Sequence, residues 1–205
     1  MIYPIAETFT SLKGEGEHTG RAMFFIRFSG CNLNCDFCDT DWSLRTKLDE
    51  YDLLRLADES GVKHIVLTGG EPGMRKLEPL ITLLVDNRYE IHIESNGSYP
   101  LPRVHWLTVS PKNVDLDPGT MMRANEVKFL CGLPKWKTII EKVIDRYRIV
   151  GRKYLMPIAL GKYDRGWSRT QKDVRGDNVK EAIEYCLLHP EFSYCAQLHK
   201  YLNIP

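Results

Sequence analysis

Three cysteines, Cys31, Cys35 and Cys38, stand close together with C-x3-C-x2-C spacing. Thiolates at this spacing can hold three corners of an iron–sulfur cube, whereas a cluster that only transfers electrons normally closes with four cysteines. One iron of such a cube has no ligand from the protein and can bind a small molecule. The spacing therefore predicts a 4Fe–4S cluster with chemistry at the open iron.

Other roles for these cysteines are a structural zinc site, a disulfide or buried thiols. Zinc needs a fourth ligand, and structural zinc sites usually come as two separated pairs of Cys or His. His18 and His64 could serve, but neither repeats a pair spacing. A disulfide is disfavoured because the first residues do not form the basic and then apolar segment of a secretory signal. The other cysteines stand singly among apolar residues, and we expect core thiols at Cys131, Cys186 and Cys195.

The segment Thr68-Gly-Gly-Glu-Pro72 is a second candidate for ligand binding. Its glycines allow the backbone to approach a ligand closely, and bare carbonyl groups together with Glu71 could receive an ammonium group. The same residues could form only a tight turn. Glu71 could instead brace the loop, which makes Gly70 the firmer contact.

Two more polar motifs follow strand-like segments. Ser95-Asn-Gly97 is typical of an Asx turn, or could offer a hydroxyl and an amide to a ligand. Ser110-Pro111-Lys112 supplies a hydroxyl, a rigid turn and a cation, which suit a carboxylate or a ribose. Lys112 could also be a solvated surface lysine.

Short apolar runs alternate with segments of helical periodicity. The runs predict strands at 23–28, 64–67, 90–94, 106–109, 126–129, 152–157 and 192–197, and the periodic segments predict helices at 50–59, 77–87, 135–147 and 178–189. This order predicts an α/β fold with a mostly parallel sheet. Four helices are few for a full eight-fold barrel of about 250 residues, so we expect an abbreviated, open half-barrel of the TIM type. The motifs above then meet at the carboxyl ends of the strands, where such folds bind ligands.

Size and charge limit the function classes. With 205 residues we expect a single domain over 1–205. Lys and Arg number 28 against 27 Asp and Glu, so no nucleic-acid-binding surface is indicated. No apolar run is long enough to cross a bilayer, so no membrane partner is expected. An oxygen-sensitive cluster and unpaired cysteines suit the cytoplasm.

The cysteine spacing followed by Gly-Gly-Glu-Pro resembles radical S-adenosylmethionine enzymes, in which the second motif holds the amino group of the methionine. Three further segments narrow the resemblance: Glu7-Thr-Phe-Thr-Ser-Leu-Lys-Gly-Glu-Gly16, Cys38-Asp39-Thr40 and Gln197-Leu-His-Lys-Tyr-Leu-Asn-Ile-Pro205. Together they look like the 7-carboxy-7-deazaguanine synthase family of the queuosine (deazapurine) pathway. The similarity runs from about Tyr3 to Pro205.

This resemblance implies a reaction. 6-Carboxy-5,6,7,8-tetrahydropterin becomes 7-carboxy-7-deazaguanine with loss of ammonia. A 5′-deoxyadenosyl radical takes a hydrogen atom from C6 of the pterin, the ring contracts, and S-adenosylmethionine is regenerated. It also implies a flavodoxin- or ferredoxin-type electron donor, a homodimer, and Mg²⁺ held at Thr40, whose neutral hydroxyl suits a hard cation beside a substrate carboxylate.

The resemblance also assigns residues. The pterin would contact Leu12, Lys13, Gly14, Glu15, Arg27, Thr68, His199 and Pro205, with Glu15 and Arg27 as catalytic residues. S-adenosylmethionine would contact Phe37, Cys38, Asp39, Gly70, Glu71, Ser95, Ser110, Pro111, Lys112, Met156, Pro157, Ile158 and Ala159. Arg27 could pair bidentately with the substrate carboxylate or point to solvent. A tail ending at Pro205 would close the pocket over the loop near the N-terminus.

Two residues depart from the family pattern. Lys13 stands where glutamine is usual, which is harmless if only the backbone meets the substrate there but otherwise adds a charge. Met156 stands where a Gln-Pro stretch is usual, and a thioether cannot make the hydrogen bonds of an amide. We therefore expect apolar or backbone contacts from Met156 to Ala159.

Two other functions compete with this interpretation. A glycyl-radical-enzyme activase shares the cysteine spacing, but its protein substrate does not need an internal pocket closed by the enzyme's own tail. A non-catalytic iron–sulfur binding protein needs neither the Gly-Gly-Glu-Pro segment nor Ser-Pro-Lys.

Overall fold

A curved sheet of nine strands runs through the molecule in the order β3-β1-β2-β4-β5-β6-β7-β8-β9. The computed structural model describes residues 1–38, 40–43, 45–158 and 177–205. The strands are β1 (Ile2–Leu12), β2 (Ala22–Phe28), β3 (Thr46–Asp49), β4 (His64–Gly69), β5 (Glu90–Ser95), β6 (Trp106–Val109), β7 (Glu126–Cys131), β8 (Arg152–Pro157) and β9 (Phe192–Tyr194). From β2 to β9 every neighbouring pair is parallel, whereas β1 is antiparallel to both β2 and β3. The two outer strands do not pair, so the open half-barrel is confirmed.

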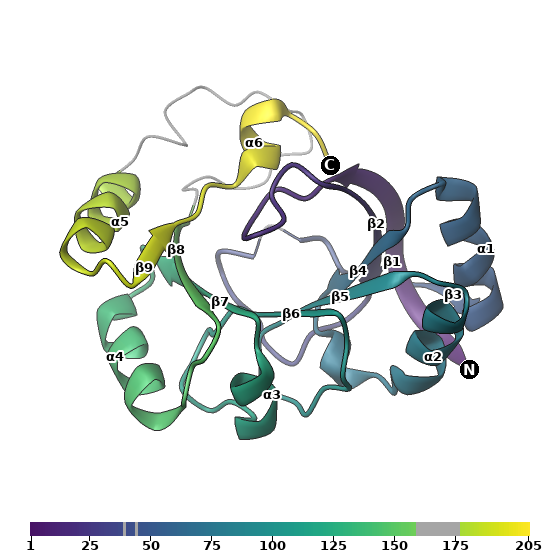
Figure 1. Cartoon of the computed structure of the whole chain (residues 1–205), viewed down its shortest axis with the longest axis horizontal. Helices are drawn as coiled ribbons and strands as arrows, with labels where there is room; N and C mark the ends of the chain where they lie inside the picture. The colour runs from purple at the N-terminus through teal and green to yellow at the C-terminus, as the bar shows by residue number, and fades with distance from the viewer. Residues whose placement is uncertain (39, 44, 159–176) are drawn as a thin grey trace.

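Helices cover the convex side of this sheet (Figure 1). They are α1 (Glu50–Ser60), α2 (Glu78–Asp86), α3 (Pro118–Arg123), α4 (Trp136–Arg146) and α5 (Asp177–Leu188), while α6 (Leu198–Leu202) lies at the open side of the arch and a short 3-10 turn, η1, spans Pro72–Met74. Helix α1 begins at a capping box between Asp49 and Asp52, and ends at Gly61 with a φ of 67°. Both devices satisfy backbone groups that a helix end leaves unpaired.

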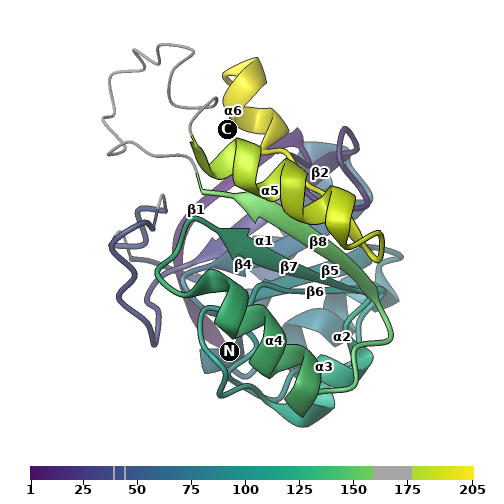
Figure 2. The same cartoon turned by 90° about the vertical axis from the view of Figure 1, so that its left-hand side faces the viewer.

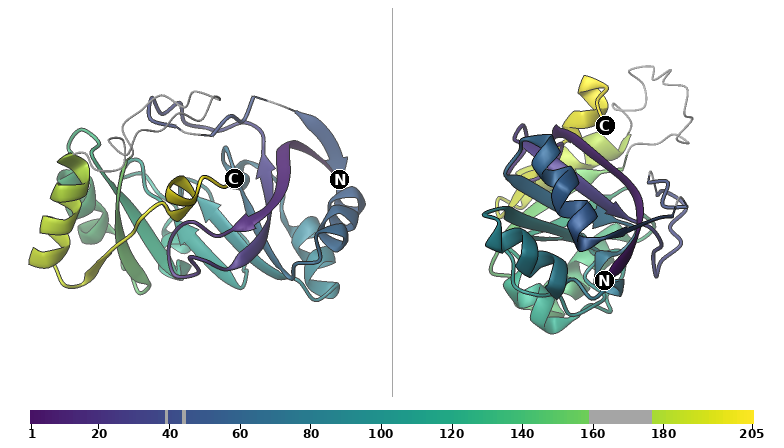
Figure 3. Two further views of the ribbon diagram at one scale, coloured as in Figure 1. Left: turned by 90° about the horizontal axis from the view of Figure 1, so that it is seen from above. Right: turned by 90° about the vertical axis from the view of Figure 1, so that its right-hand side faces the viewer.

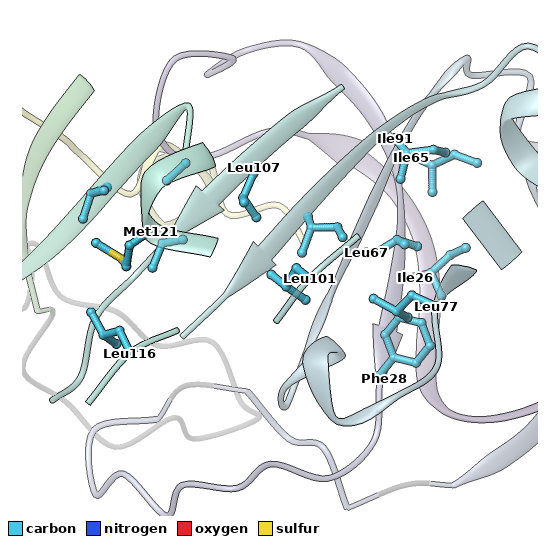
Figure 4. Close-up of a cluster of buried hydrophobic side chains, with 14 of the residues drawn as sticks. Ile26, Phe28, Ile65, Leu67, Leu77, Ile91, Leu101, Leu107, Leu116 and Met121 are labelled. Atoms are coloured by element: carbon cyan, nitrogen blue, oxygen red, sulfur yellow. The ribbon is translucent and has the colours of Figure 1, made fainter. Parts of the chain in front are cut away.

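The main core lies between the strands and these helices, as the apolar side chains in Figure 4 show. Ile65 and Leu67 of β4 and Ile91 of β5 belong to it and are fully buried. Because side chains alternate along a strand, His64, Val66 and Thr68 of β4 point to the opposite, concave face. The concave face therefore carries polar side chains such as His64 and Thr68 beside a small apolar cluster that includes Val66.

All seven predicted strands and four predicted helices exist, and the bounds 106–109 and 152–157 are correct. The last predicted strand was too long, since β9 ends at Tyr194 and the chain then turns to bring Leu198 N to Gly14 O at 2.8 Å. Other elements were missed: β1, β3, η1, α3 and α6. They are short, or mix polar and apolar residues without a clear period, so local pattern did not reveal them.

The loop after β2 lies at the carboxyl ends of the parallel strands, and the β1–β2 hairpin lies at their amino ends (Figure 3, left). Figure 2 shows the loop after β2 projecting beyond the sheet on the side where the parallel strands end. Within the described residues, no helix combines the length and the apolar character needed to span a bilayer.

Candidate active site

The cysteine loop follows β2 directly. Cys31 and Cys35 are partly exposed and Cys38 is exposed, and all three are free thiols. A hydrogen bond of 3.0 Å from Cys38 N to Cys35 O forms a turn that brings this pair together. Three accessible thiols on one loop at the carboxyl edge form a donor set that suits an iron–sulfur cluster.

The Gly-Gly-Glu-Pro loop after β4 packs backbone to backbone against the cysteine loop. Gly70 N donates to Phe28 O and Glu71 N donates to Gly30 O, both at 3.0 Å. A Cβ atom on Gly70 would collide with the carbonyl group of Gly30 and lie 3.0 Å from Cys31 N. Only glycine fits where these two loops meet.

Gly70→Ala is expected to weaken S-adenosylmethionine binding by about 10- to 100-fold, because overpacking costs about 1–3 kcal/mol and here separates two ligand loops. Equilibrium dialysis with cluster-loaded protein would measure the change. Gly119→Ala is the matched control, since its Cβ would meet only the flexible Asp117 side chain at 3.3 Å. Equal S-adenosylmethionine affinity in the two variants would contradict a binding role for the loop at Gly70.

Glu71 braces this loop from inside the protein. Its side chain is fully buried and accepts hydrogen bonds from Ser95 Oγ (2.7 Å), Asn96 N (2.7 Å) and Gly73 N (2.8 Å). Burial raises the pKa of Glu71, although these hydrogen bonds oppose the rise. Both carboxylate oxygens and the Ser95 hydroxyl are engaged within the protein, which matches the bracing alternative. Direct contacts from Glu71 and Ser95 to a cofactor stay predictions.

The other predicted cofactor residues gather on neighbouring elements. Lys112 Nζ donates to Ser110 Oγ at 2.6 Å, and Pro111 between them is buried. Phe37 and Ile158 pack against a small apolar cluster that includes Met156. Apolar contacts from Met156 and Ile158 are thus sterically available, with Pro157 between them at the end of β8. Asp39 and Ala159 lie outside the described residues.

Four charged side chains from distant parts of the chain form a buried network on the concave face. Lys128 Nζ lies 2.6 Å from Glu15 Oε2 and 3.3 Å from Glu94 Oε1, and Lys13 pairs with Glu94. Lys13 is only 4% exposed and Lys128 only 2%. Two amino groups thus face two carboxylates in a region where an unpaired charge would be costly.

This network shifts the proton affinities of its members. Although burial opposes ionisation, Lys128, His199 and Lys13 hold the pKa of Glu15 well below its usual range. Burial and the nearby Lys128 lower the pKa of Lys13 to about 7. Burial alone would lower the pKa of Lys128, but Glu15, Cys195 and Glu126 together outweigh burial and raise it. Glu15 is therefore a carboxylate at neutral pH and accepts hydrogen bonds.

Lys13→Gln is expected to flatten the pH dependence of stability. In the folded protein the pKa of Lys13 is about 7, against 10.5 for an ordinary lysine. Between these values the unfolded chain binds a proton that the folded chain does not, so wild-type stability rises with pH by up to about 1.4 kcal/mol per unit. Urea unfolding of the cluster-free protein at several pH values would show the difference, with the exposed Lys142→Gln as control. Parallel curves for Lys13→Gln and wild type would refute this.

Arg27 and Thr40 lie together beside this network. Arg27 donates from Nε to Glu7 Oε1 at 2.7 Å and from Nη1 to Thr40 Oγ1 at 3.2 Å. The Arg27 side chain is one-fifth exposed. Arg27 also pairs in register with Thr68 of β4, and the Thr68 hydroxyl lies 3.5 Å from Glu94 Oε2. The guanidinium thus faces the concave side rather than open solvent.

The C-terminal segment closes against the β1–β2 hairpin (Figure 1). Gln197 Nε2 donates to Glu15 Oε1 at 2.8 Å, and Ser11 Oγ donates to Pro205 O at 2.7 Å. A Cβ atom on Gly14 would collide with the His199 ring. Leu12, at the end of β1, is exposed beside this contact. The structure therefore brings together the described residues that were predicted to contact a substrate.

Glu94, Lys128 and Gln197 belong to this site but were missed in the sequence. Lys128 and Glu126 are charged residues in the otherwise apolar strand Glu126-Val-Lys-Phe-Leu-Cys131, a pattern that could have marked them as buried charges. Glu94 lies two residues after His92 on β5, so the two side chains point to the same face of the sheet. Gln197 was recognised only as the first residue of the C-terminal motif, because its contact with Glu15 depends on the path of the tail.

Comparison with known proteins matches this geometry to a family. The Radical SAM superfamily matches residues 25–116. A 7-carboxy-7-deazaguanine synthase of Nitratidesulfovibrio vulgaris is 34% identical, and one of Escherichia coli K12 is 32% identical, each alignment covering the whole of both chains. The chain belongs to the 7-carboxy-7-deazaguanine synthase family. The crystal structure of QueE from Escherichia coli also superposes with a TM-score of 0.80 at 27% identity, covering 97% of this chain and 95% of that one.

Membership of the 7-carboxy-7-deazaguanine synthase family confirms the predicted radical S-adenosylmethionine enzyme. The superfamily implies a 4Fe–4S cluster and S-adenosylmethionine as cofactors. The glycyl-radical activase and the passive iron–sulfur protein are not favoured, since the relatives above are synthases along their whole length.

Proposed function

We propose that this chain converts 6-carboxy-5,6,7,8-tetrahydropterin to 7-carboxy-7-deazaguanine with release of ammonia. The observation that carries this proposal is the buried network of Lys13, Glu15, Glu94 and Lys128 under a C-terminal cover. An internal polar pocket of this kind fits a small, hydrogen-bonding heterocycle better than a protein substrate.

The residues of the chain divide the work. Cys31, Cys35 and Cys38 would hold the cluster, and the backbone at Gly70 would receive the amino group of S-adenosylmethionine. When bound, these cofactors supply a carbon-centred radical that removes a hydrogen atom from the substrate. Arg27 would pair with the substrate carboxylate, as a guanidinium does in two parallel hydrogen bonds.

Glu15 is positioned to orient the pterin. Its ionised carboxylate can accept from the N–H groups of the pterin edge, while Lys128 keeps it charged and in place. Leu198–Leu202 and the Lys13–Glu94 pair would exclude water from the opposite sides of the pocket. Fixed charges in a closed site stabilise developing charge more than they could in water.

Mg²⁺ belongs to the proposal as an ion at the Thr40 hydroxyl. Arg27 Nη1 already lies 3.2 Å from this oxygen, so two cations would meet there unless a substrate carboxylate lay between them. We expect magnesium to bind together with the substrate. A flavodoxin- or ferredoxin-type donor, a homodimer and a cytoplasmic location complete the proposal.

Anaerobic turnover of cluster-loaded protein with S-adenosylmethionine, reductant, Mg²⁺ and 6-carboxytetrahydropterin, read by mass spectrometry, tests the proposal. We expect 7-carboxy-7-deazaguanine, with little net loss of S-adenosylmethionine. Cleavage of S-adenosylmethionine without this product would refute the substrate. Absence of any cleavage from fully loaded protein would refute the radical chemistry as well.

A further inference from the structure

A histidine cluster lies at the amino ends of the parallel strands, at the opposite end of the sheet from the cysteine loop. The function proposed above does not use it. His64 and Glu90 are the first residues of β4 and β5 and pair in register, and His92 follows two positions along β5. Alternation along the strands places all three side chains on the concave face. The β1–β2 hairpin, which lies at this end in Figure 3 (left), brings His18 beside them.

The ligand atoms of this cluster are close enough for one ion. One atom each from His64, Glu90 and His92 lies within 4.8 Å of the other two. Ligands of a tetrahedral zinc ion, with bonds of about 2.0–2.2 Å, lie about 3.3 Å from one another. Small side-chain rotations would therefore bring the three atoms into range, since His64 Nδ1 and Glu90 Oε2 are already 3.2 Å apart.

The polar atoms here are unsatisfied, which is the stronger observation. Both ring nitrogens of His92, and Nδ1 of His64 and Nε2 of His18, are buried without a hydrogen-bond partner among the described residues. Buried polar groups in folded proteins nearly always have partners, and an exception points to a missing ion or water. One nitrogen each of His64 and His92, together with the Glu90 carboxylate, can therefore meet at one shared ion.

Ring packing also holds His92 in place. His18 packs edge-to-face on His92 at 4.8 Å and on Trp106 at 4.4 Å between ring centroids. Glu90 is exposed and leaves a path from solvent to the site.

We propose that His64, Glu90 and His92 form a binding site for a divalent late transition-metal ion of the Zn²⁺ type at the floor of the half-barrel. Two imidazoles and one carboxylate are a ligand set that zinc favours. Because His18 packs edge-to-face against His92, the ion would also steady the hairpin that carries Lys13, Gly14 and Glu15. The site is distinct from the cysteine loop and does not depend on the proposed reaction.

Zinc content tests this inference on untagged, cluster-loaded protein that is incubated with Zn²⁺ and then gel-filtered. We expect about one zinc per chain in addition to the cluster iron. Zinc affinity is then measured in a Cys31→Ala/Cys35→Ala/Cys38→Ala protein, in which the thiols of the cysteine loop cannot compete. Co²⁺ as a spectroscopic probe should show the visible bands of a low-coordinate nitrogen and oxygen site.

Variants separate this site from adventitious binding. His64→Gln and His92→Gln should each weaken Zn²⁺ binding by at least about 100-fold, and Glu90→Gln by about 10- to 100-fold, since even indirect support of a metal ligand is worth this much. His189→Gln, a partly exposed histidine on another face of the fold, should change nothing. If His92→Gln does not fold, the exposed Glu90→Gln still decides. Failure of the triple cysteine variant to retain zinc, or equal affinity in Glu90→Gln and wild type, would overturn the proposal.

Discussion

Cys35→Ala is expected to abolish product formation and to leave no stable 4Fe–4S cluster. Two thiolates cannot hold the irons that three hold, and S-adenosylmethionine then lacks the iron it must bind. The loss should far exceed the about 10- to 100-fold that follows removal of a residue that only supports a metal ligand. Iron and sulfide analysis, electron paramagnetic resonance of the reduced protein, and turnover by mass spectrometry measure the three consequences separately.

Cys186→Ala is the matched control for this experiment. Cys186 is a partly buried free thiol on α5 that packs at the margin of the main core. Its replacement should leave iron content and turnover unchanged, with at most a small loss of stability. The cluster assignment would be wrong if Cys35→Ala kept a full complement of iron and normal turnover.

Lys128→Met should destabilise the fold and also remove activity. Lys128 is buried against Glu15 and Glu94, so its loss removes the cation that pairs with both carboxylates. Removing one partner of a buried ion pair costs about 3–5 kcal/mol. For a chain of this size, we expect the Tm to fall by roughly 10 °C. Thermal unfolding of the cluster-free protein and the pterin KM of the loaded enzyme provide the two measurements.

A double variant distinguishes charge balance from a general packing defect. Lys128→Met/Glu15→Gln removes one charge of each sign, so it should recover part of the stability that Lys128→Met loses. Activity should not recover, because Glu15 is proposed to orient the substrate. The exposed Lys142→Met should stay within about 0.5 kcal/mol of wild type. A loss below about 1 kcal/mol in Lys128→Met would show that the network is not a buried ion cluster.

The cysteine loop and the parallel strands were predictable because their signals are local. The spacing of Cys31, Cys35 and Cys38 is a property of one short loop, and an apolar run such as 106–109 shows a strand within a few residues. The motifs that follow strands could also be placed together, since parallel strands all end on the same side of the sheet. The position of Gly70 beside the cysteine loop followed from this rule, and the structure adds the close approach of Gly30 that requires a glycine at position 70.

The polar interior depended on contacts between residues far apart in the chain. Lys128 and Glu15 are 113 residues apart, and Gln197 and Glu15 are 182 apart. Whether a charge on a strand meets solvent or a buried partner depends on sheet curvature, strand register and the path of the tail, which local periodicity does not report. For this reason Arg27 could be selected as a site residue from the sequence, but its protein partners Glu7 and Thr40 could not be predicted. Lys128 and Glu94 were not selected as site residues at all. The cysteine spacing and strand order thus came from the sequence, whereas the partners that make the pocket a site came from tertiary structure.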